Sequence, residues 1–167
     1  QGVIAFVSNN GWVDGNTADG LGKTLTDEFS DLWVYNLRGN QRTAGELSRQ
    51  EGGKVFGSGA RTGVAVLVAA KRKGADGLCN LRYHGVADYQ SREEKLAGIE
   101  TAALPSVQWR SIRSNESGDW LNQRKDEFSG YPALCDDREV HFDLHSRGVE
   151  TTRDAWCYNF SADAVAS

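Results

Sequence analysis

Three runs of apolar residues predict buried β-strands in the first half of the chain. They lie at residues 3–7, 32–37 and 63–71. Short runs rich in β-branched and aromatic side chains are typical of strands that are covered on both faces of a sheet. A fourth segment, residues 79–86, predicts a strand at the edge of the sheet, with Leu81 and Tyr83 on the same face.

The spacing of side chains predicts a helix between the first two strands. Leu21, Leu25 and Phe29 recur every four residues, as they would on one face of a helix. Asn16 and Thr17 precede them as candidate N-cap residues. The order strand, helix, strand predicts a right-handed βαβ unit over this part of the chain.

A second predicted helix begins with a capping box. The hydroxyl of Ser91 and the carboxylate of Glu94 are spaced so that each can bond to the backbone N–H at the other's position. Leu96 and Ile99 then mark the buried side of this helix. By contrast, residues 38–61 are polar and Gly-rich with little periodicity, which predicts a long loop, and such loops are often functional.

The composition is that of an ordinary globular domain. Apolar residues make up 39% of the 167 residues, and charged residues make up 25%. No apolar run approaches the roughly 20 residues that a membrane span needs. The net charge of −4 gives no bulk attraction to nucleic acid, so a DNA contact would require a local basic patch.

The cysteines and the first residue add two expectations. Cys79, Cys135 and Cys157 are odd in number and far apart, which is typical of reduced thiols, so we expect a cytoplasmic protein. The chain begins at Gln1, directly before an apolar run, and contains no Met, which predicts an excised piece of a longer protein.

Three longer strings resemble a known enzyme group. Residues 14–20 (DGNTADG), 36–46 (NLRGNQRTAGE) and 146–160 (SRGVETTRDAWCYNF) are similar to the Type ISP restriction–modification enzymes. These are large bacterial single chains that combine nuclease, helicase, methyltransferase and target-recognition regions. The predicted strands also look like the late strands of amino-directed DNA methyltransferases.

The resemblance implies a fold and a division of the chain. The fold is α/β: a partial class I, Rossmann-like methyltransferase sheet that enters at its fifth strand, followed by a less regular α+β segment. Residues 1–103 would form the C-terminal half of the methyltransferase catalytic domain. Residues 104–167 would form a linker and the start of the target-recognition region.

The resemblance also implies an activity for the parent protein, the transfer of a methyl group from S-adenosylmethionine to N6 of adenine in DNA. The family's glycine-rich cofactor loop and its Asn-Pro-Pro-Tyr tetrad are both missing, since proline occurs only at Pro105 and Pro132. We therefore expect the fragment alone to bind no cofactor and to be inactive. Its expected partners are double-stranded DNA and the rest of the parent polypeptide, with its cofactor-binding half, helicase and nuclease.

Phe56 is the main candidate site residue. In the related methyltransferases, an aromatic residue just before the last hairpin stacks on the extruded adenine and replaces part of the stacking lost from the duplex. Gly57 and Gly59 beside it would let the backbone approach the base closely. The alternative interpretation is a phenylalanine that packs beneath a loop.

Further candidates for DNA contact lie after the first strand and among the arginines. Asn9, Asn10 and Trp12 follow the first strand at its carboxyl end, where open α/β sheets bind ligands, although a plain turn is the alternative. Candidates for phosphate contact are Arg38, Arg42, Arg61, Arg147 and Arg153. Glu46 and Glu51 lie among the first of these, so a solvated loop of mixed charge is also open.

Other site and function classes receive less support. His141, Asp143 and His145 would share one face of a strand, but no fourth ligand stands out, so we predict no metal site. A nicotinamide-dependent oxidoreductase is not supported, because no Gly-x-Gly-x-x-Gly motif follows a strand. A non-catalytic DNA-binding or protein-interaction module remains the alternative function.

Overall fold

The computed structural model describes residues 1–15, 18–57, 59–74, 77–125, 127 and 130–132. The chain divides into two compact units, residues 1–124 and residues 125–167. The boundary near residue 103 that the family resemblance implies stays a prediction. No helix in the described part of the chain is long and apolar enough to cross a membrane.

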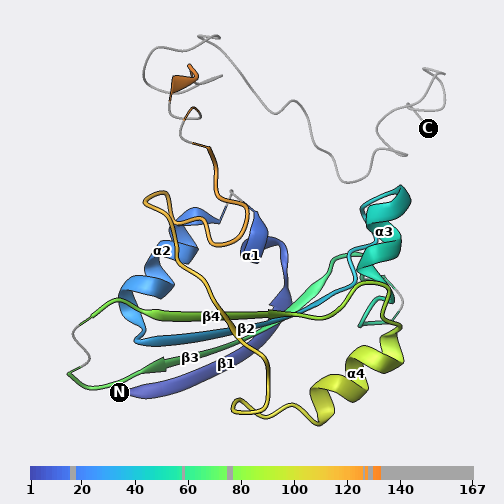
Figure 1. Ribbon diagram of the computed structural model, residues 1–167, viewed down its shortest axis with the longest axis horizontal. Coiled ribbons are helices and arrows are strands. Elements are labelled where there is room, and N and C mark those ends of the chain that lie inside the picture. The colour runs from blue at the N-terminus through green and yellow to red at the C-terminus, as the bar shows by residue number, and fades with distance from the viewer. Residues whose placement is uncertain (16–17, 58, 75–76, 126, 128–129, 133–167) are drawn as a thin grey trace, which may run out of the picture. The chain divides into compact units, whose positions relative to one another are not determined.

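The first unit is built on a five-stranded sheet with the strand order β1-β3-β2-β4-β5 (Figure 1). The strands are β1 (Gly2–Asn9), β2 (Asp31–Arg38), β3 (Val64–Lys71), β4 (Asn80–Gly85) and β5 (Arg110–Ser111). The central strand β3 is antiparallel to both β1 and β2, while β4 runs parallel to β2 and antiparallel to β5. The sheet is therefore mixed and mostly antiparallel.

Four helices accompany the described part of the sheet. They are α1 (Gly11–Asp14), α2 (Asp19–Glu28), α3 (Gly45–Glu51) and α4 (Arg92–Glu100). The capping box of α4 is confirmed, because the Ser91 hydroxyl accepts from the backbone N–H of Glu94 while the Glu94 carboxylate accepts from the N–H of Ser91. The cap expected for α2 is wrong: the N-cap is Ala18, which makes no side-chain bond, and residues 16 and 17 lie outside the described residues.

The structure refines or corrects three expectations about this part of the chain. The predicted βαβ unit is split: β1 and β2 run in the same direction with α2 between them in the chain, but β3 lies between them in the sheet. The strand at residues 79–86 is not at the edge, because β5 pairs with its far side. Residues 38–61 are not a continuous loop, because they contain α3. The strand order and the pairing of β5 depend on contacts between distant segments, which local patterns do not encode, whereas α3 is a short surface helix with no buried side chain to mark it in the sequence.

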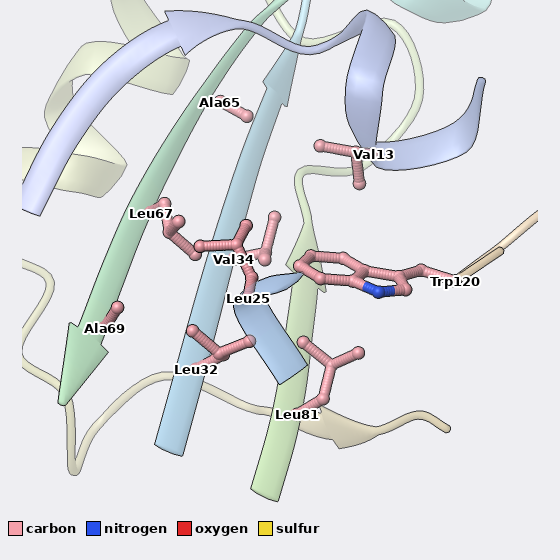
Figure 2. Packing of buried hydrophobic residues seen from close by; sticks show 9 residues of the cluster. All are labelled: Val13, Leu25, Leu32, Val34, Ala65, Leu67, Ala69, Leu81 and Trp120. Atoms are coloured by element: carbon pink, nitrogen blue, oxygen red, sulfur yellow. The ribbon is translucent and has the colours of Figure 1, made fainter. Parts of the chain in front are cut away.

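One face of the sheet carries the larger part of the core. Leu32 and Val34 of β2, and Leu67 of β3, are fully buried there. Leu25 of α2 packs on this face, and Trp120 inserts its indole beside it from a segment far along the chain (Figure 2). Burying these side chains supplies most of the stabilisation at about 25 cal/mol per Å² of apolar surface.

The opposite face carries a smaller core beneath α4 (Figure 1). Leu37 and Val64 are buried there together with Val55, which comes from the segment before β3. Leu96 and Ile99 of α4 pack against this cluster, which confirms the predicted buried side of the helix. Both ends of the polar segment between β2 and β3 are thus fixed to the sheet by apolar contacts.

The first strand differs from the prediction in its burial. Val3 is 68% exposed and Val7 is 56% exposed, and Ile4 and Phe6 on the other face are exposed as well. The expectation of a strand covered on both faces was therefore wrong for the described residues. The run is apolar on both faces, and its outer edge has no paired strand in the described part of the chain. Such an edge is a template for further strand pairing.

A buried carboxylate organises the other end of the sheet. Asp31, at the start of β2, is fully buried and accepts hydrogen bonds from Arg72 at 2.5 Å, Arg82 at 3.3 Å and Asn80 at 3.3 Å. Burial alone would raise the pKa of Asp31, but the hydrogen bonds, chiefly from Arg72, outweigh that effect and lower it. The carboxylate therefore stabilises the fold in its charged form, and it joins β2 to β4 and to the segment after β3.

We predict that the exposed strand β1 drives self-association of the chain. Replacing both Val3 and Val7 with Lys should shift the chain towards monomer, because charged side chains on an edge strand oppose strand pairing. The free energy of unfolding should change by only about 0.5 kcal/mol, since both sites are exposed. Sedimentation velocity at several concentrations measures the shift, and the charge-matched control replaces two other exposed residues, Leu47 and Leu78, with Lys. Equal association of the double variant and the wild type would contradict the prediction.

We predict that stability falls with acid through Asp31. A carboxylate whose folded pKa lies below its unfolded value of about 3.9 stabilises the fold above that pH. The stabilisation is lost as the pH falls through the folded pKa. Asp31→Asn should lower the free energy of unfolding by about 1–3 kcal/mol at pH 7 and flatten its acid dependence. Urea unfolding from pH 7 to pH 2 measures both effects, with Asp27→Asn on α2 as control; an unchanged acid slope would refute the assignment.

Candidate nucleic-acid interface at the carboxyl end of the strands

The strand register gathers several predicted site residues at one end of the sheet. Asn9 at the end of β1 and Arg38 at the end of β2 both pair with Val64, the first residue of β3. On the far side of β2, Gly85 at the end of β4 pairs with Asn36. The carboxyl ends of β1, β2 and β4 therefore meet at the amino end of β3. Open α/β sheets bind their ligands at the carboxyl ends of strands.

A chain of side-chain hydrogen bonds crosses these strand ends. The Nδ2 of Asn10 donates to the Oδ1 of Asn36 at 3.0 Å, and the Nδ2 of Asn36 donates to the hydroxyl of Tyr83 at 3.1 Å. The backbone N–H of Arg38 also donates to the Oδ1 of Asn36, at 2.9 Å. Asn10 and Asn36 are both buried. Because buried polar groups are costly when unpaired, this network fixes how the three strand ends lie.

Tyr83 completes the network on β4. Burial raises the pKa of its hydroxyl above the ordinary value, although the hydrogen bond from Asn36 opposes the shift. The hydroxyl is therefore protonated at neutral pH. The guanidinium of Arg110 lies over the Tyr83 ring, 5.5 Å from the ring centroid. A hollow of 400 Å³ opens at this point, bordered by both residues together with Arg38 and His84.

Arg38 is held firmly in the structure. Its φ of 55° is in the left-handed region, its Nε donates to Glu51 at 3.2 Å, and its Nη1 contacts the carboxylate of Asp88. Burial alone would lower the pKa of Arg38, but Asp88 and Glu51 raise it above the ordinary value. This arginine joins the loops after β2 and β4, so a phosphate contact would have to compete with two carboxylates.

Arg42 and Arg61 present a different picture. Both are exposed, and neither forms an ion pair with any residue that the structure describes. A backbone hydrogen bond of 2.8 Å from Gln41 to the carbonyl of Arg61 brings the two segments that carry them together. Their guanidinium groups are thus available to a phosphate, and Glu46 nearby in sequence is paired with Arg49.

The residues after β1 are mainly engaged in the fold. Asn9 is exposed, but its Oδ1 accepts from the backbone of Gly11 at 3.2 Å, as in a turn. Trp12 is half-buried, donates its Nε1 to the hydroxyl of Ser8 at 2.9 Å, and packs edge-on against Trp120 with ring centroids 5.5 Å apart. Asn10 belongs to the buried network. Of these three, Asn9 offers the most accessible polar groups to a ligand.

Phe56 projects from this end of the sheet. Its side chain is 52% exposed, whereas the preceding residue, Val55, is buried in the core beneath α4. Gly57 has open space where a side chain would lie, and Gly59 has a φ of +95°, which a residue with a side chain rarely adopts. An anchored residue thus precedes the exposed ring, and an unhindered backbone follows it.

Several candidates lie outside the described residues. They are Arg147, Arg153, Cys135, Cys157 and the stretch from His141 to His145. Cys79 is described: it is half-buried, and burial raises its pKa to about 11, so the thiol is protonated at neutral pH. A nucleophilic role for Cys79 is therefore not favoured.

Two features of this region were missed by the sequence interpretation. Asn36 and Tyr83 lie within strands, where a polar side chain indicates nothing until its neighbours are known. Tyr35, His84 and Trp109 form a cluster of rings. The ring centroid of His84 lies 4.8 Å from that of Tyr35 and 6.2 Å from that of Trp109. The alternation of Tyr35 with buried residues on β2 was a weak signal for this cluster.

Comparison with known proteins places this arrangement in a wider context. No protein-family model and no curated protein matches the chain. Solved structures do match it. A nuclease-deletion mutant of the Type ISP restriction–modification enzyme LlaGI, in complex with a DNA substrate mimic, is 41% identical over 99% of this chain, with a TM-score of 0.77. The ATP-dependent Type ISP enzyme LlaBIII bound to DNA is 32% identical over 99% of the chain, with a TM-score of 0.82.

A DrdV–DNA complex is a third match, 29% identical over 99% of the chain with a TM-score of 0.71. The fold and sequence thus define a segment of the restriction–modification class of proteins. More specifically, the resemblance to the Type ISP enzymes is confirmed, because the match extends over nearly the whole chain. The chain spans only 16% of the LlaGI chain and 11% of the LlaBIII chain.

We predict that the amide of Asn36 stabilises this end of the sheet. Asn36→Ala should lower the free energy of unfolding by about 2–3 kcal/mol, because it leaves the Asn10 amide and the Arg38 N–H without partners. Tyr83→Phe, which removes a single acceptor, should cost about 1 kcal/mol. Urea unfolding measures both, with the exposed Asn122→Ala as control. A loss for Asn36→Ala no larger than for Asn122→Ala would rule the network out as a stabilising element.

Proposed function

We propose that this chain is part of a DNA adenine-N6 methyltransferase within a multifunctional restriction–modification enzyme. In this proposal, the chain contributes a base-stacking residue, Phe56, and residues that contact the DNA backbone. The parent enzyme transfers a methyl group from S-adenosylmethionine to the exocyclic nitrogen of adenine, in the cytoplasm. The fragment alone is inactive, because the residues that hold the cofactor and polarise the amine lie elsewhere in the parent.

The observation that carries the proposal is the exposed ring of Phe56 at the carboxyl end of the strands. Apolar rings of this size are usually buried, so a half-exposed one between an anchored residue and two glycines calls for a partner. An adenine that leaves the duplex loses its stacking at a cost of a few kcal/mol. A ring available at the surface offsets part of that cost.

The charges around Phe56 suit a DNA backbone. Arg61 follows Phe56 in the chain, and Arg42 lies before α3 next to Gln41, whose N–H bonds to the carbonyl of Arg61; both arginines are exposed, which supports phosphate contact. The two Type ISP structures that match the chain were both determined with DNA or a DNA mimic. Double-stranded DNA is therefore the partner that we assign to this end of the sheet.

The exposed strand β1 supports the assignment to a larger, Rossmann-like sheet. It is apolar on both faces, as a strand inside a parallel sheet would be, yet it lies at the edge here. We infer that the parent's sheet continues beyond β1. The parallel direction of β1 and β2, with α2 between them in the chain, agrees with this inference.

The residues described here do not fit S-adenosylmethionine as a complete site. At the end of the sheet, the amide of Asn10 is bonded to Asn36, and Arg38 is paired with Glu51 and Asp88. These polar groups are already bonded to one another, although Arg38 also borders the hollow beside Tyr83. We assign the methyl donor to the rest of the parent enzyme and route no step of the reaction through this chain's side chains.

One observation favours the alternative function, a non-catalytic DNA-binding or protein-interaction module: the edge strand β1 exposes apolar side chains that a partner could cover. A module of this kind would bind DNA through the arginines alone, with no contribution from a base-stacking ring. The two functions therefore differ in what Phe56 does.

We predict that Phe56→Ala weakens binding to a duplex with a poorly paired target base. The duplex carries the fluorescent adenine analogue 2-aminopurine opposite an abasic site, and binding is measured at two salt concentrations. Loss of the ring should reduce affinity about tenfold, because base–aromatic stacking contributes about 1–3 kcal/mol. Binding should also weaken with salt in both proteins, since phosphate contacts release counterions.

Leu47→Ala, at an exposed apolar residue on α3, is the matched control and should bind as the wild type does. Salt-dependent binding that ignores Phe56 would select the plain DNA-contact module instead. Failure to bind even at low salt would refute both DNA-binding functions for the isolated chain.

A further inference from the structure

Two backbone hydrogen bonds join the segment just before Phe56 to the residues that precede α4. The N–H of Gly53 donates to the carbonyl of Gln90 at 2.9 Å, and the N–H of Tyr89 donates to the carbonyl of Gln50 at 3.1 Å. Residues 50–53 and 89–90 are thus paired although about forty residues separate them. This pairing holds the end of α3 against the N-terminus of α4.

The two chains approach each other too closely for side chains. A Cβ on Gly52 would lie 2.2 Å from the carbonyl oxygen of Gln90, and a Cβ on Gly53 would lie 2.4 Å from the backbone N of Arg92. Gly52 also has a φ of +66°, which favours glycine. The contact therefore has a single geometry that substitutions at these positions would disturb.

Lys95 of α4 fastens this contact from below. Its side chain is 1% exposed, and its ammonium donates to the carbonyl of Glu51 at 2.6 Å and to the carbonyl of Gly53 at 2.7 Å. These carbonyls lie at the C-terminal end of α3, where a cation is favoured by the helix dipole. Burial lowers the pKa of Lys95, and the nearby charge of Glu51 partly opposes the shift. A buried ammonium is costly unless it is bonded in this way.

Arg92 fastens the next residues of the same segment. Its Nε donates to the carbonyl of Val55 at 2.8 Å, one residue before Phe56. Lys95 and Arg92 thus hold alternate carbonyls, at residues 51, 53 and 55, from the same side. Both side chains project from the first turns of α4, whose capping box is independent of these bonds.

We propose that Lys95 and Arg92 are positioning residues that hold residues 51–55 against α4 and thereby fix the direction in which Phe56 projects. The inference rests on the proposed function, because it assigns a purpose to the orientation of the ring. Neither residue touches DNA in this role. A ring on a loop free to move would lose its stacking gain to the entropy of ordering the loop.

The test combines a measurement of the loop with a measurement on DNA. Hydrogen exchange, followed by mass spectrometry on the 167-residue chain, reports the amides of residues 50–57 and, as an internal reference, those of β3. Lys95→Met should speed exchange at residues 50–57 about tenfold or more and leave β3 unchanged. The affinity for the 2-aminopurine duplex should fall towards that of Phe56→Ala, while the salt dependence of binding is retained.

Arg92 supplies variants that the fold tolerates, because half of its side chain is exposed. Arg92→Met removes the bond to Val55 and should also speed exchange in the segment 50–57, where the N–H groups of Gly52 and Gly53 are hydrogen-bonded, whereas Arg92→Lys keeps a donor and should restore the wild-type value. Lys23→Met, at an exposed lysine of α2, is the control for loss of a positive charge.

The outcomes separate this inference from the proposed function. Unchanged exchange at residues 50–57 in both Lys95→Met and Arg92→Met overturns the inference whatever the DNA result is. Faster exchange with undiminished affinity for the 2-aminopurine duplex also overturns it, provided that Phe56→Ala weakens that affinity. If Phe56→Ala itself binds as tightly as the wild type, the proposed function fails, and faster exchange in Lys95→Met then supports only the anchoring of the loop.

Discussion

The pairing of β3 with two strands at once is the constraint on which the rest of the structure depends. Because β3 is antiparallel to both β1 and β2, the carboxyl ends of those strands meet at its first residue, Val64. The polar residues that follow β1 and β2 are brought together there, and the segment that enters β3 carries Phe56 to the same place. The buried amides of Asn10 and Asn36 are the side-chain consequence of this backbone arrangement.

Features with local causes could be predicted from the sequence. The capping box at Ser91 needs only two residues three positions apart, and the strands at residues 32–37 and 63–71 need only a run of apolar side chains. The gathering of Asn9 and Arg38 at one end followed from the rule that ligand-binding residues follow strands, once the strands were correctly located. What these residues bind is not encoded in that rule.

Features that depend on distant partners were not predictable. The order of the strands and the two-residue strand β5 depend on pairing across the chain, and α3 has no apolar stripe because all its residues lie near the surface. The burial of Lys95 was not predictable either, because a lysine on a helix is normally exposed to solvent. The exposure of β1 was also hidden, because a run of apolar residues does not show which segments will cover it.

Trp120 has a consequence for where the first unit ends. Its indole packs beside Leu25 and Val34 in the main core (Figure 2). The neighbouring Asp119 accepts hydrogen bonds from Arg124 and Asn115. The segment that carries Trp120 is therefore part of the sheet domain and of its core, rather than a linker that leaves the domain. A chain cut at residue 103 would lose this indole and leave a hole in the main core, so the sheet needs the residues up to Arg124 to keep its core filled.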